Sequence, residues 1–493
     1  MRGTDLPSSM ASSMASSLAF SVQALGRLPA GLVRECEEAA EFARRFNREV
    51  VNPVCLELDR RIEADSSVMP DEIVAEMGRR GLLTLWIPKI FGGGGFSPFS
   101  MMAFNEELAS GCLGVSNLIG AHYFAYGLAS ATSNMSALKI LSEACLAGEK
   151  SGRPCLLSAA ITEPAAGTDL EDVDLIDRAK VQTTVRRTEK GLRLQGAKVF
   201  ISNAAMCRWL VVSAYGDLKK PGAEPWIVLV PREHPGVRIG RVEQKMGQHA
   251  CPASPVFFDD CEIKPEWVCF SPDQFKSLAE ARRYADLLIQ DVLALSRMNV
   301  GAYGAGAAIA SVNAVRDAVE KAKVPQPEWF HAVLGEMLAN YQVARATTWD
   351  AGCAAALVGA NRALFEKSVY GMNRSAPPGF WKAVAKLLNL RSLTARLRRA
   401  RLAHADPETI DRLSALGAAA KVSGSTAAVK NAQLALDLSG VFSHEPRFVA
   451  EVSKILRDSK LLQIYEGTNL LNLLEVSRTF QSGARPFQEG ASP

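Results

Sequence analysis

Apolar residues recur every three to four positions along the first and last parts of the chain, which is the spacing of one face of an α-helix. The pattern is clear in "LVRECEEAAEFARRFNREVV" at 32–51 and in "PDEIVAEMGRRGLLTLWIP" at 70–88. It returns in a long stretch at 276–321. These periodicities predict an N-terminal helical domain over 33–153 and a C-terminal helical bundle over 277–482.

Between these regions the apolar residues gather into short runs bounded by Gly, Pro, Asn and Asp, as in β-strands. Examples are "RLQGAKVFISN" at 193–203 and "WLVVSAY" at 209–215. We therefore expect an antiparallel β-barrel-like domain over 154–276, and an α+β multi-domain fold for the whole chain. Three further segments complete the predicted domain plan: a flexible N-terminal tail over 1–32, an insertion over 367–406 and a C-terminal tail over 483–493.

The charge, the cysteines and the lengths of the apolar runs argue against several classes of protein. There are 56 basic and 52 acidic residues, and the resulting net charge of +4 argues against a nucleic-acid binder. The ten cysteines indicate free thiols in a reducing compartment. No apolar run reaches the length of about 18 residues that a membrane-spanning helix needs. We expect a cytoplasmic protein, or one of the mitochondrial matrix if the source is eukaryotic. The Ser-, Ala- and Met-rich start fits a tail or a transit peptide, and its few arginines favour the tail.

One segment of the C-terminal region is strongly basic. No acidic residue lies between Glu366 and Asp406, whereas Lys and Arg are frequent and apolar residues follow helical spacing. A basic amphipathic helix of this kind predicts peripheral contact with an anionic membrane through 380–401. A solvated insertion or a contact with a partner subunit explains the same pattern.

Two polar clusters of the middle region could hold a ligand. "SAAITEPAAGTDL" at 158–170 places Thr162 and Thr168 in a loop, and "KVFISNAA" at 198–205 ends a predicted strand with Phe200 and Ser202. Hydroxyl groups and a ring face suit a flat polar cofactor. An ordinary capped loop and a plain strand end explain the same residues. The six histidines are dispersed without metal-ligand spacing, so no metal site is expected.

A third cluster, "LLQIYEGTNLLNLLEV" at 461–476, places Glu466 directly before Gly467 at the mouth of a predicted helix. The positive end of the helix favours the carboxylate, and the apolar neighbours disfavour it by desolvation. A carboxylate under opposing influences suits a catalytic base, although a helix-entry residue would look the same. The helix itself can be capped by Thr468 or Asn469.

Taken in order, these clusters resemble the acyl-CoA dehydrogenase family. The resemblance extends over about 70–480 and includes "GLLTLWIPKIFGGGG", "EQKMGQHACPASPVFFDDCEI" and "ILRDSKLLQIYEGTNLLNLLEVSR" besides the clusters above. It implies helical, β-barrel-like and helical domains, an FAD cofactor, and a dimer or tetramer of like or unlike subunits. It also implies α,β-dehydrogenation of an acyl-CoA in fatty acid metabolism, with electrons passed to an electron-transfer flavoprotein.

The resemblance assigns roles to single residues. Glu466 matches the base that removes the α-proton while a hydride leaves the β-carbon for the flavin. Some relatives carry the base immediately before the active-site arginine, where this chain has Ser296, which supports Glu466 as the base. The remaining assignments form two sets: Thr162, Phe200, Ser202 and Thr468 as cofactor contacts, and Thr168, Arg297 and Gly467 as substrate contacts. Phe200 and Ser202 replace a usual tryptophan and threonine.

The chain also departs from the family pattern. The usual Arg-x-x-Phe-Gly stretch, which contacts the FAD of a neighbouring subunit, has no equivalent in "DAVEKAKVPQPEWFHAVLGEM". Ser439 replaces the first of two glycines, and Leu470 stands where a polar cofactor contact is usual. Two alternatives therefore stay open: a non-catalytic or half-site scaffold subunit of a heteromeric dehydrogenase, and an acyl-CoA oxidase. The small residues at 299–308 leave room for a bulky acyl chain or simply allow close helix packing.

Overall fold

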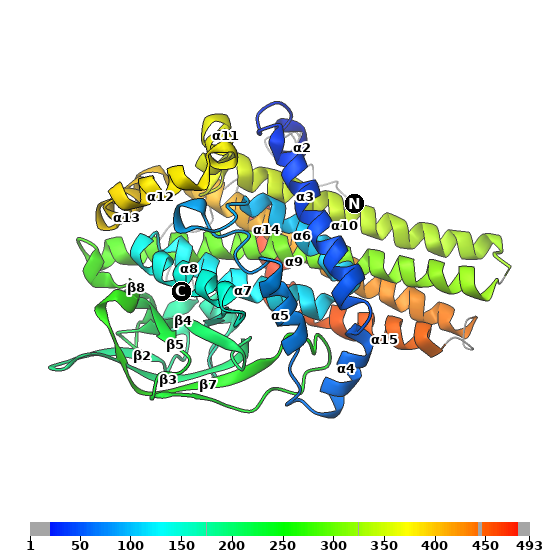
Figure 1. Cartoon of the computed structure of the whole chain (residues 1–493), viewed down its shortest axis with the longest axis horizontal. Coiled ribbons are helices and arrows are strands. Elements are labelled where there is room, and N and C mark those ends of the chain that lie inside the picture. The colour runs from blue at the N-terminus through cyan, green and yellow to red at the C-terminus, as the bar shows by residue number, and fades with distance from the viewer. Residues whose placement is uncertain (1–19, 174, 324, 442–445, 482–493) are drawn as a thin grey trace, which may run out of the picture.

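The structure, a computed structural model, describes residues 20–173, 175–323, 325–441 and 446–481. Helices from both ends of the chain lie together on one side, and a β-sheet lies on the other (Figure 1). This arrangement confirms the predicted order of a helical, a β and a second helical domain. No helix among the described residues is long and apolar enough to cross a membrane.

The N-terminal helices bury the apolar faces that the sequence periodicity predicted. In α3, Leu32, Ala39, Ala43 and Phe46 are all buried, as expected for one face of a helix. Helix α7 packs against both β1 and the long α9, so it joins the sheet to the C-terminal helices. The N-terminal helices are α3 (Gly31–Phe46), α4 (Cys55–Ala64), α5 (Asp71–Arg79), α6 (Pro98–Gly111), α7 (Leu113–Ala131) and α8 (Met135–Lys150).

Part of the predicted flexible tail is instead packed against the body. Residues 1–19 lie outside the described residues, but the short helix α2 (Phe20–Gln23) is described. The Phe20 side chain is buried against Ala294, Cys353 and Leu413, because it fills a gap between C-terminal helices. The prediction of a loose tail is therefore wrong for residues 20–32. The predicted tail over 483–493 lies outside the described residues.

The β domain is an open sheet and not a closed barrel. Its strands follow the order β6-β7-β3-β2-β4-β5-β8, and β1 pairs with β4 beside this path. Most pairs are antiparallel as expected, but β1 runs parallel to β4, and β2 meets β4 in parallel at Thr184 and Tyr215. The strands are β1 (Leu156–Ala160), β2 (Thr184–Thr188), β3 (Gly191–Ser202), β4 (Cys207–Tyr215), β5 (Pro225–Pro231), β6 (Val237–Ile239), β7 (Ala253–Ile263) and β8 (Val268–Phe270).

The C-terminal bundle contains a very close contact between two of its helices, α9 and α14. A Cβ atom added to Gly304 would lie 2.2 Å from the backbone of Gly424, so α9 and α14 touch backbone to backbone. Close packing therefore accounts for the small residues at 299–308. The C-terminal helices are α9 (Leu278–Ala322), α10 (Glu328–Val358), α11 (Lys367–Ser375), α12 (Pro378–Leu387), α13 (Leu390–His404), α14 (Pro407–Asp437), α15 (Pro446–Leu461) and α16 (Asn469–Gln481).

The basic segment forms three helices, α11, α12 and α13, and part of it is packed against the body of the protein. The guanidinium of Arg398 is buried and donates to the backbone carbonyls of Thr132 and Cys269, both at 2.9 Å. Arg401 donates to the carbonyl of Ala131 at 2.8 Å. These two arginines therefore fasten the segment to the body of the protein, whereas other basic residues of α12 and α13 stay exposed.

Candidate active site

Glu466 lies in the short loop between α15 and α16, and its backbone is left-handed. Its φ of +56° is unusual for a residue other than glycine, and Gly467 follows with a φ of +77°. Backbone strain of this kind persists only where the surrounding structure enforces it, and it concentrates at functional sites. The loop therefore needs contacts that hold it.

The backbone carbonyls of this loop are held by side chains from three helices. Arg297 of α9 donates from Nε to the carbonyl of Glu466 at 3.2 Å. Asn472 of α16 donates to the carbonyls of Glu466 at 3.2 Å and of Gly467 at 3.0 Å. Lys421 of α14 donates to the carbonyl of Gly467. The loop conformation is thus fixed by buried polar side chains and not by the loop sequence alone.

The Glu466 carboxylate accepts a direct hydrogen bond from a serine of α9. Ser296 Oγ donates to Glu466 Oε2 at 2.6 Å. Burial raises the pKa of Glu466, while the Ser296 hydrogen bond and the charges of Arg297 and Lys421 oppose that rise. Ser296, which replaces the alternative base position, therefore acts in this chain as a partner of Glu466.

Two ionisable residues of this site were not foreseen from the sequence. Lys421 and Glu171 both lie beside Gly467: Lys421 binds its carbonyl, and a Cβ atom added to Gly467 would lie 3.2 Å from Glu171 Oε2. Burial and the neighbouring Glu466 charge raise the pKa of Glu171 to about 8. Burial, followed by the Arg297 charge, lowers the pKa of Lys421 to about 8. In the sequence, Lys421 stands inside the run of small residues "GAAAKVSGS". A charged residue among residues that allow close helix packing was the feature that could have marked it as a buried site residue.

The structure gives Thr468 a structural role besides the predicted cofactor role. Its Oγ1 accepts a hydrogen bond from the N–H of Leu471 at 3.3 Å, which caps the start of α16. The capping prediction is therefore confirmed for Thr468. Asn469, the alternative cap, instead accepts from Lys421 at 3.0 Å and pairs with Ser425.

The predicted cofactor residues of the β domain form a second group. The N–H of Val199 donates to the carbonyl of Thr162 at 2.9 Å, which brings Thr162 beside Phe200. Phe200 lies where the pairing of β3 with β7 shifts register, has a φ of +58°, and is 65% exposed. A β-bulge re-aims a side chain in this way. Ser202 lies two residues further on, at the end of β3.

A buried ion pair holds the Thr162 loop against β3. Lys198 Nζ donates to Glu163 Oε1 and to the carbonyl of Ile161, both at 2.8 Å. Glu163 also accepts from the N–H groups of Gln182 and Thr183. These contacts clamp the residues on both sides of Thr162. Thr168 begins a short 3-10 helix (Thr168–Leu170) that leads directly to Glu171.

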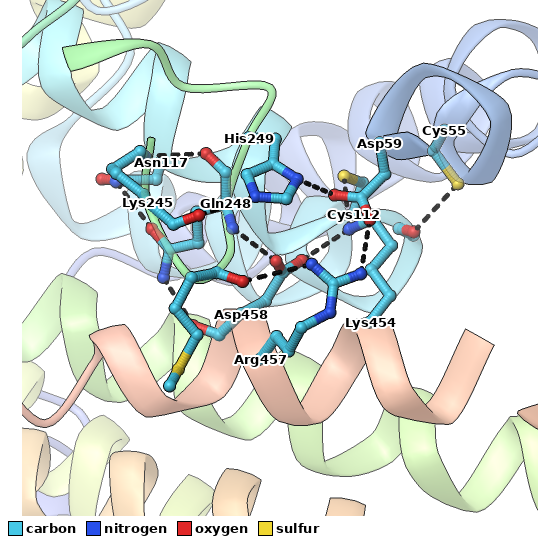
Figure 2. Close-up of polar contacts among 12 residues, drawn as sticks. Cys55, Asp59, Cys112, Asn117, Lys245, Gln248, His249, Lys454, Arg457 and Asp458 are labelled. Atoms are coloured by element: carbon cyan, nitrogen blue, oxygen red, sulfur yellow. Dashed lines mark hydrogen bonds and ion pairs between the residues drawn. The ribbon is translucent and has the colours of Figure 1, made fainter. Parts of the chain in front are cut away.

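A second cluster of buried charges anchors α15, the helix that leads to Glu466 (Figure 2). Asp458 pairs with Lys454 on the same helix and accepts from the N–H of Gln248 in the β domain. Arg457 pairs with Asp59 of α4 at 2.7 Å, and Asp59 lies 2.9 Å from His249 Nδ1. The helix before the Glu466 loop is thereby tied to both other domains.

No group of three or more His, Cys, Asp or Glu side chains in the described part of the chain could hold a metal ion. The ten cysteines are all free thiols, as predicted.

Known families match all three parts of the chain. The model of the acyl-CoA dehydrogenase N-terminal domain matches residues 34–143, that of the middle domain 158–261, and that of the C-terminal domain 380–480. A similar curated protein is the acryloyl-CoA reductase (NADH) of Anaerotignum propionicum. It is 25% identical over 462 residues, which cover 92% of this chain and 97% of that protein.

Solved structures share the fold over nearly their full length. Butyryl-CoA dehydrogenase from Megasphaera elsdenii has a TM-score of 0.64 at 21% identity, covering 90% of this chain and 97% of that one. FMN-bound TdsC from Paenibacillus sp. A11-2 has a TM-score of 0.67 at 17% identity, covering 92% and 98%. The matches to all three domains show that this chain belongs to the acyl-CoA dehydrogenase family of flavoprotein oxidoreductases.

Proposed function

We propose that the protein oxidises an acyl-CoA thioester to the trans-2-enoyl-CoA, with Glu466 as the base that removes the α-proton. The observation that carries the proposal is the Glu466 carboxylate itself. It is held on a strained loop by Arg297 and Asn472 and receives the Ser296 hydrogen bond at 2.6 Å. Family members interconvert acyl-CoA and enoyl-CoA, and the similar acryloyl-CoA reductase is named for the reverse direction.

The electrostatics of the site suit a base that works near neutral pH. Burial raises the pKa of Glu466 and makes it a stronger base, and Arg297 and Lys421 keep enough of it ionised to react. The backbone N–H of Glu466 is proposed to bind the thioester carbonyl, where negative charge develops as the proton leaves. Thr168, Arg297 and Gly467 are the further substrate contacts in this proposal.

The residues present fit the isoalloxazine end of FAD. An exposed phenylalanine ring on a β-bulge, next to Thr162 and close to Ser202, offers an apolar face and hydroxyl groups to a flat polar ring. In the proposal Thr162, Phe200, Ser202 and Thr468 hold the cofactor. When bound, FAD supplies the acceptor for the hydride that leaves the β-carbon. The electrons are proposed to pass to an electron-transfer flavoprotein.

The decisive experiment uses the purified full-length protein. Its visible spectrum is recorded, and acyl-CoAs of several lengths are then added without oxygen. We expect a yellow protein that one of them bleaches. Glu466→Gln should keep the colour and slow bleaching by about 10²- to 10⁴-fold or more. Glu475→Gln, on the adjoining helix α16, is the matched control and should bleach normally.

Three other outcomes would contradict this proposal or favour one of the alternative functions. Persistent bleaching in the Glu466→Gln protein contradicts Glu466 as the base. A colourless protein, alone and with co-expressed partners, favours the scaffold subunit. Rapid oxygen consumption without an electron-transfer flavoprotein favours the oxidase.

Two surfaces support contacts outside the site. Leu470, Leu473 and Leu474 of α16 are exposed at 69%, 52% and 45%, which supports a homo- or hetero-oligomer formed through this helix.

Phe380 and Leu387 of α12 are exposed among basic residues, which supports peripheral contact with an anionic membrane. Sedimentation with anionic liposomes tests the second contact. Binding that persists after Phe380→Ser and Leu387→Ser would contradict it.

A further inference from the structure

Glu171 carries a buried oxygen that lacks a partner. Among the described residues, no side chain or backbone group forms a hydrogen bond with Glu171 Oε2, although this atom is shielded from solvent. Buried polar oxygens are nearly always paired, because an unpaired one loses its hydration without compensation. An exception inside a substrate site indicates a group that is paired only when ligand is bound.

The position of Glu171 places this oxygen at the reacting end of the site. Glu171 Oε2 would lie 3.2 Å from a Cβ atom on Gly467, the residue that follows the proposed base. The charged groups that face it are Glu466, Arg297 and Lys421. It therefore faces the same space as the Glu466 loop, although it comes from the β domain.

The two neighbouring cations are already committed to other acceptors. Arg297 donates from Nε to the Glu466 carbonyl at 3.2 Å, and Lys421 donates to the Gly467 carbonyl and to Asn469 Oδ1. The adjacent Asp172 pairs with Arg478 at 3.5 Å. Glu171 is thus not one half of a structural ion pair.

The protonation state of Glu171 decides what it can bind. Burial and the Glu466 charge raise its pKa to about 8, so the carboxyl is mainly neutral at pH 7. A neutral carboxyl carries an O–H donor besides its acceptor oxygen. A partner with an acceptor oxygen would satisfy it, and a hydrocarbon chain would not.

We propose that Glu171 is a specificity-determining residue that donates a hydrogen bond to an oxygen substituent on the acyl group, so that the enzyme prefers oxygen-bearing acyl-CoAs over plain hydrocarbon ones. This inference rests on the proposed function and names the substrate class of that site. A hydrocarbon acyl chain leaves the Glu171 hydroxyl buried and unpaired, and a site built around a polar contact rejects ligands that lack it.

The test measures binding in the Glu466→Gln background, where turnover does not interfere. Titration calorimetry compares butyryl-CoA with 3-hydroxybutyryl-CoA and 4-hydroxybutyryl-CoA, and hexanoyl-CoA with 5-hydroxyhexanoyl-CoA. We expect the oxygenated ligand of at least one pair to bind about 5- to 100-fold tighter at pH 6, and this preference to weaken as pH rises and Glu171 ionises. Because Glu466→Gln removes a charge that helps to raise the Glu171 pKa, this ionisation should occur at a lower pH than in the unmodified protein.

Variants assign the preference to Glu171. Glu171→Leu should abolish the preference by tightening hydrocarbon binding and weakening oxygenated binding. Glu171→Gln, which keeps a donor but cannot ionise, should retain part of the preference and lose its pH dependence. Asp172→Asn is the matched control and should leave the preference unchanged.

The experiment distinguishes a failure of this inference from a failure of the proposed function. Binding of acyl-CoAs with no preference, or with a preference that survives Glu171→Leu, overturns the inference and leaves the proposed function standing. An equal loss for every ligand in Glu171→Leu also overturns it, because it indicates a contact common to all thioesters. No binding of any acyl-CoA overturns both.

Discussion

Two clusters of buried charges lie at opposite ends of the short segment 454–472, and they differ in how their charges are neutralised. In the cluster around α15, each charge has an opposite charge nearby, as in the Arg457–Asp59 pair at 2.7 Å. In the site around Glu466, the cations bind backbone carbonyls, and Glu171 Oε2 has no partner in the described structure. Both clusters are largely buried. They differ in whether each charge has an oppositely charged partner, not in their exposure to solvent.

The direction of the pKa shifts follows this difference. At Asp59, burial acts to raise the pKa, but the His249 hydrogen bond, the Lys454 charge and Arg457 outweigh it and lower the pKa to about 2. At Glu171 and Lys421, burial wins and brings each pKa to about 8. Paired charges stabilise the fold in one ionisation state, whereas unpaired ones are left able to change protonation near neutral pH.

The largest expected effect comes from breaking the paired cluster. Asp458→Asn removes the carboxylate partner of the buried Lys454 ammonium, which should cost about 3–5 kcal/mol of unfolding free energy. Urea unfolding measures it. Glu336→Gln is the matched control, because its pair with Lys430 at 2.7 Å is solvent-exposed and should contribute less than about 1 kcal/mol. Equal losses in the two variants would show that the α15 cluster is not structural.

A smaller effect is expected from removing one charge of the unpaired site. Lys421→Met removes a cation that opposes the raised pKa of Glu466, so that pKa should rise further. Since the proposed base must be ionised to accept the proton, the acid limb of the kcat/KM profile should move to higher pH, with about 10- to 100-fold loss at pH 7. Lys430→Met, on the exposed face of the same helix, should change neither. An unshifted acid limb in Lys421→Met would contradict the electrostatic role of this lysine.

The smallest effect concerns His249, whose pKa is raised mainly by its hydrogen bond to Asp59. Its stabilising contribution is complete below the unfolded pKa of about 6.5 and is lost as pH rises through the folded pKa. In His249→Gln, the decline in unfolding free energy between pH 6 and pH 8.5 should shrink by up to about 1 kcal/mol. The Asp59 contribution, present above about pH 4 and lost as pH falls towards 2, should shrink but not vanish, because Lys454 and Arg457 still lower the Asp59 pKa. An unchanged alkaline decline would exclude His249 as its source.

The order of helical and β regions could be predicted because the spacing of apolar residues within a short segment depends on the secondary structure of that segment alone. Apolar spacings of three to four residues indicated the helices, and short apolar runs bounded by Gly, Pro, Asn and Asp indicated the strands, in the regions where the structure has them. Sheet closure was not predictable, since it depends on whether β6 and β8 meet, and no local pattern reports that contact. The packed segment 20–32 was missed because a single Phe20 among Ser and Ala gives no periodic signal.

The proposed site could be inferred from the sequence only where one segment carries several of its residues. Glu466, Gly467 and Thr468 stand together in the chain, and the family resemblance assigns them roles that stay predictions. Glu171 follows a recognisable motif but lies in "LEDVDL", which has the composition of an exposed turn. Its side chain is shielded because the β domain packs against α9 and α16. Such a contact between distant segments cannot be predicted from the local sequence.

The glycine contact between α9 and α14 has a consequence for how this enzyme could diversify. Ser296 and Arg297 precede Gly301 and Gly304 by about one to two turns, and Lys421 precedes Gly424 by one. Because the contact joins backbone to backbone, no exchange of side chains can bring these helices closer. New acyl specificities must then arise by altering residues that border the site, such as Glu171, while the distance between α9 and α14 is inherited unchanged.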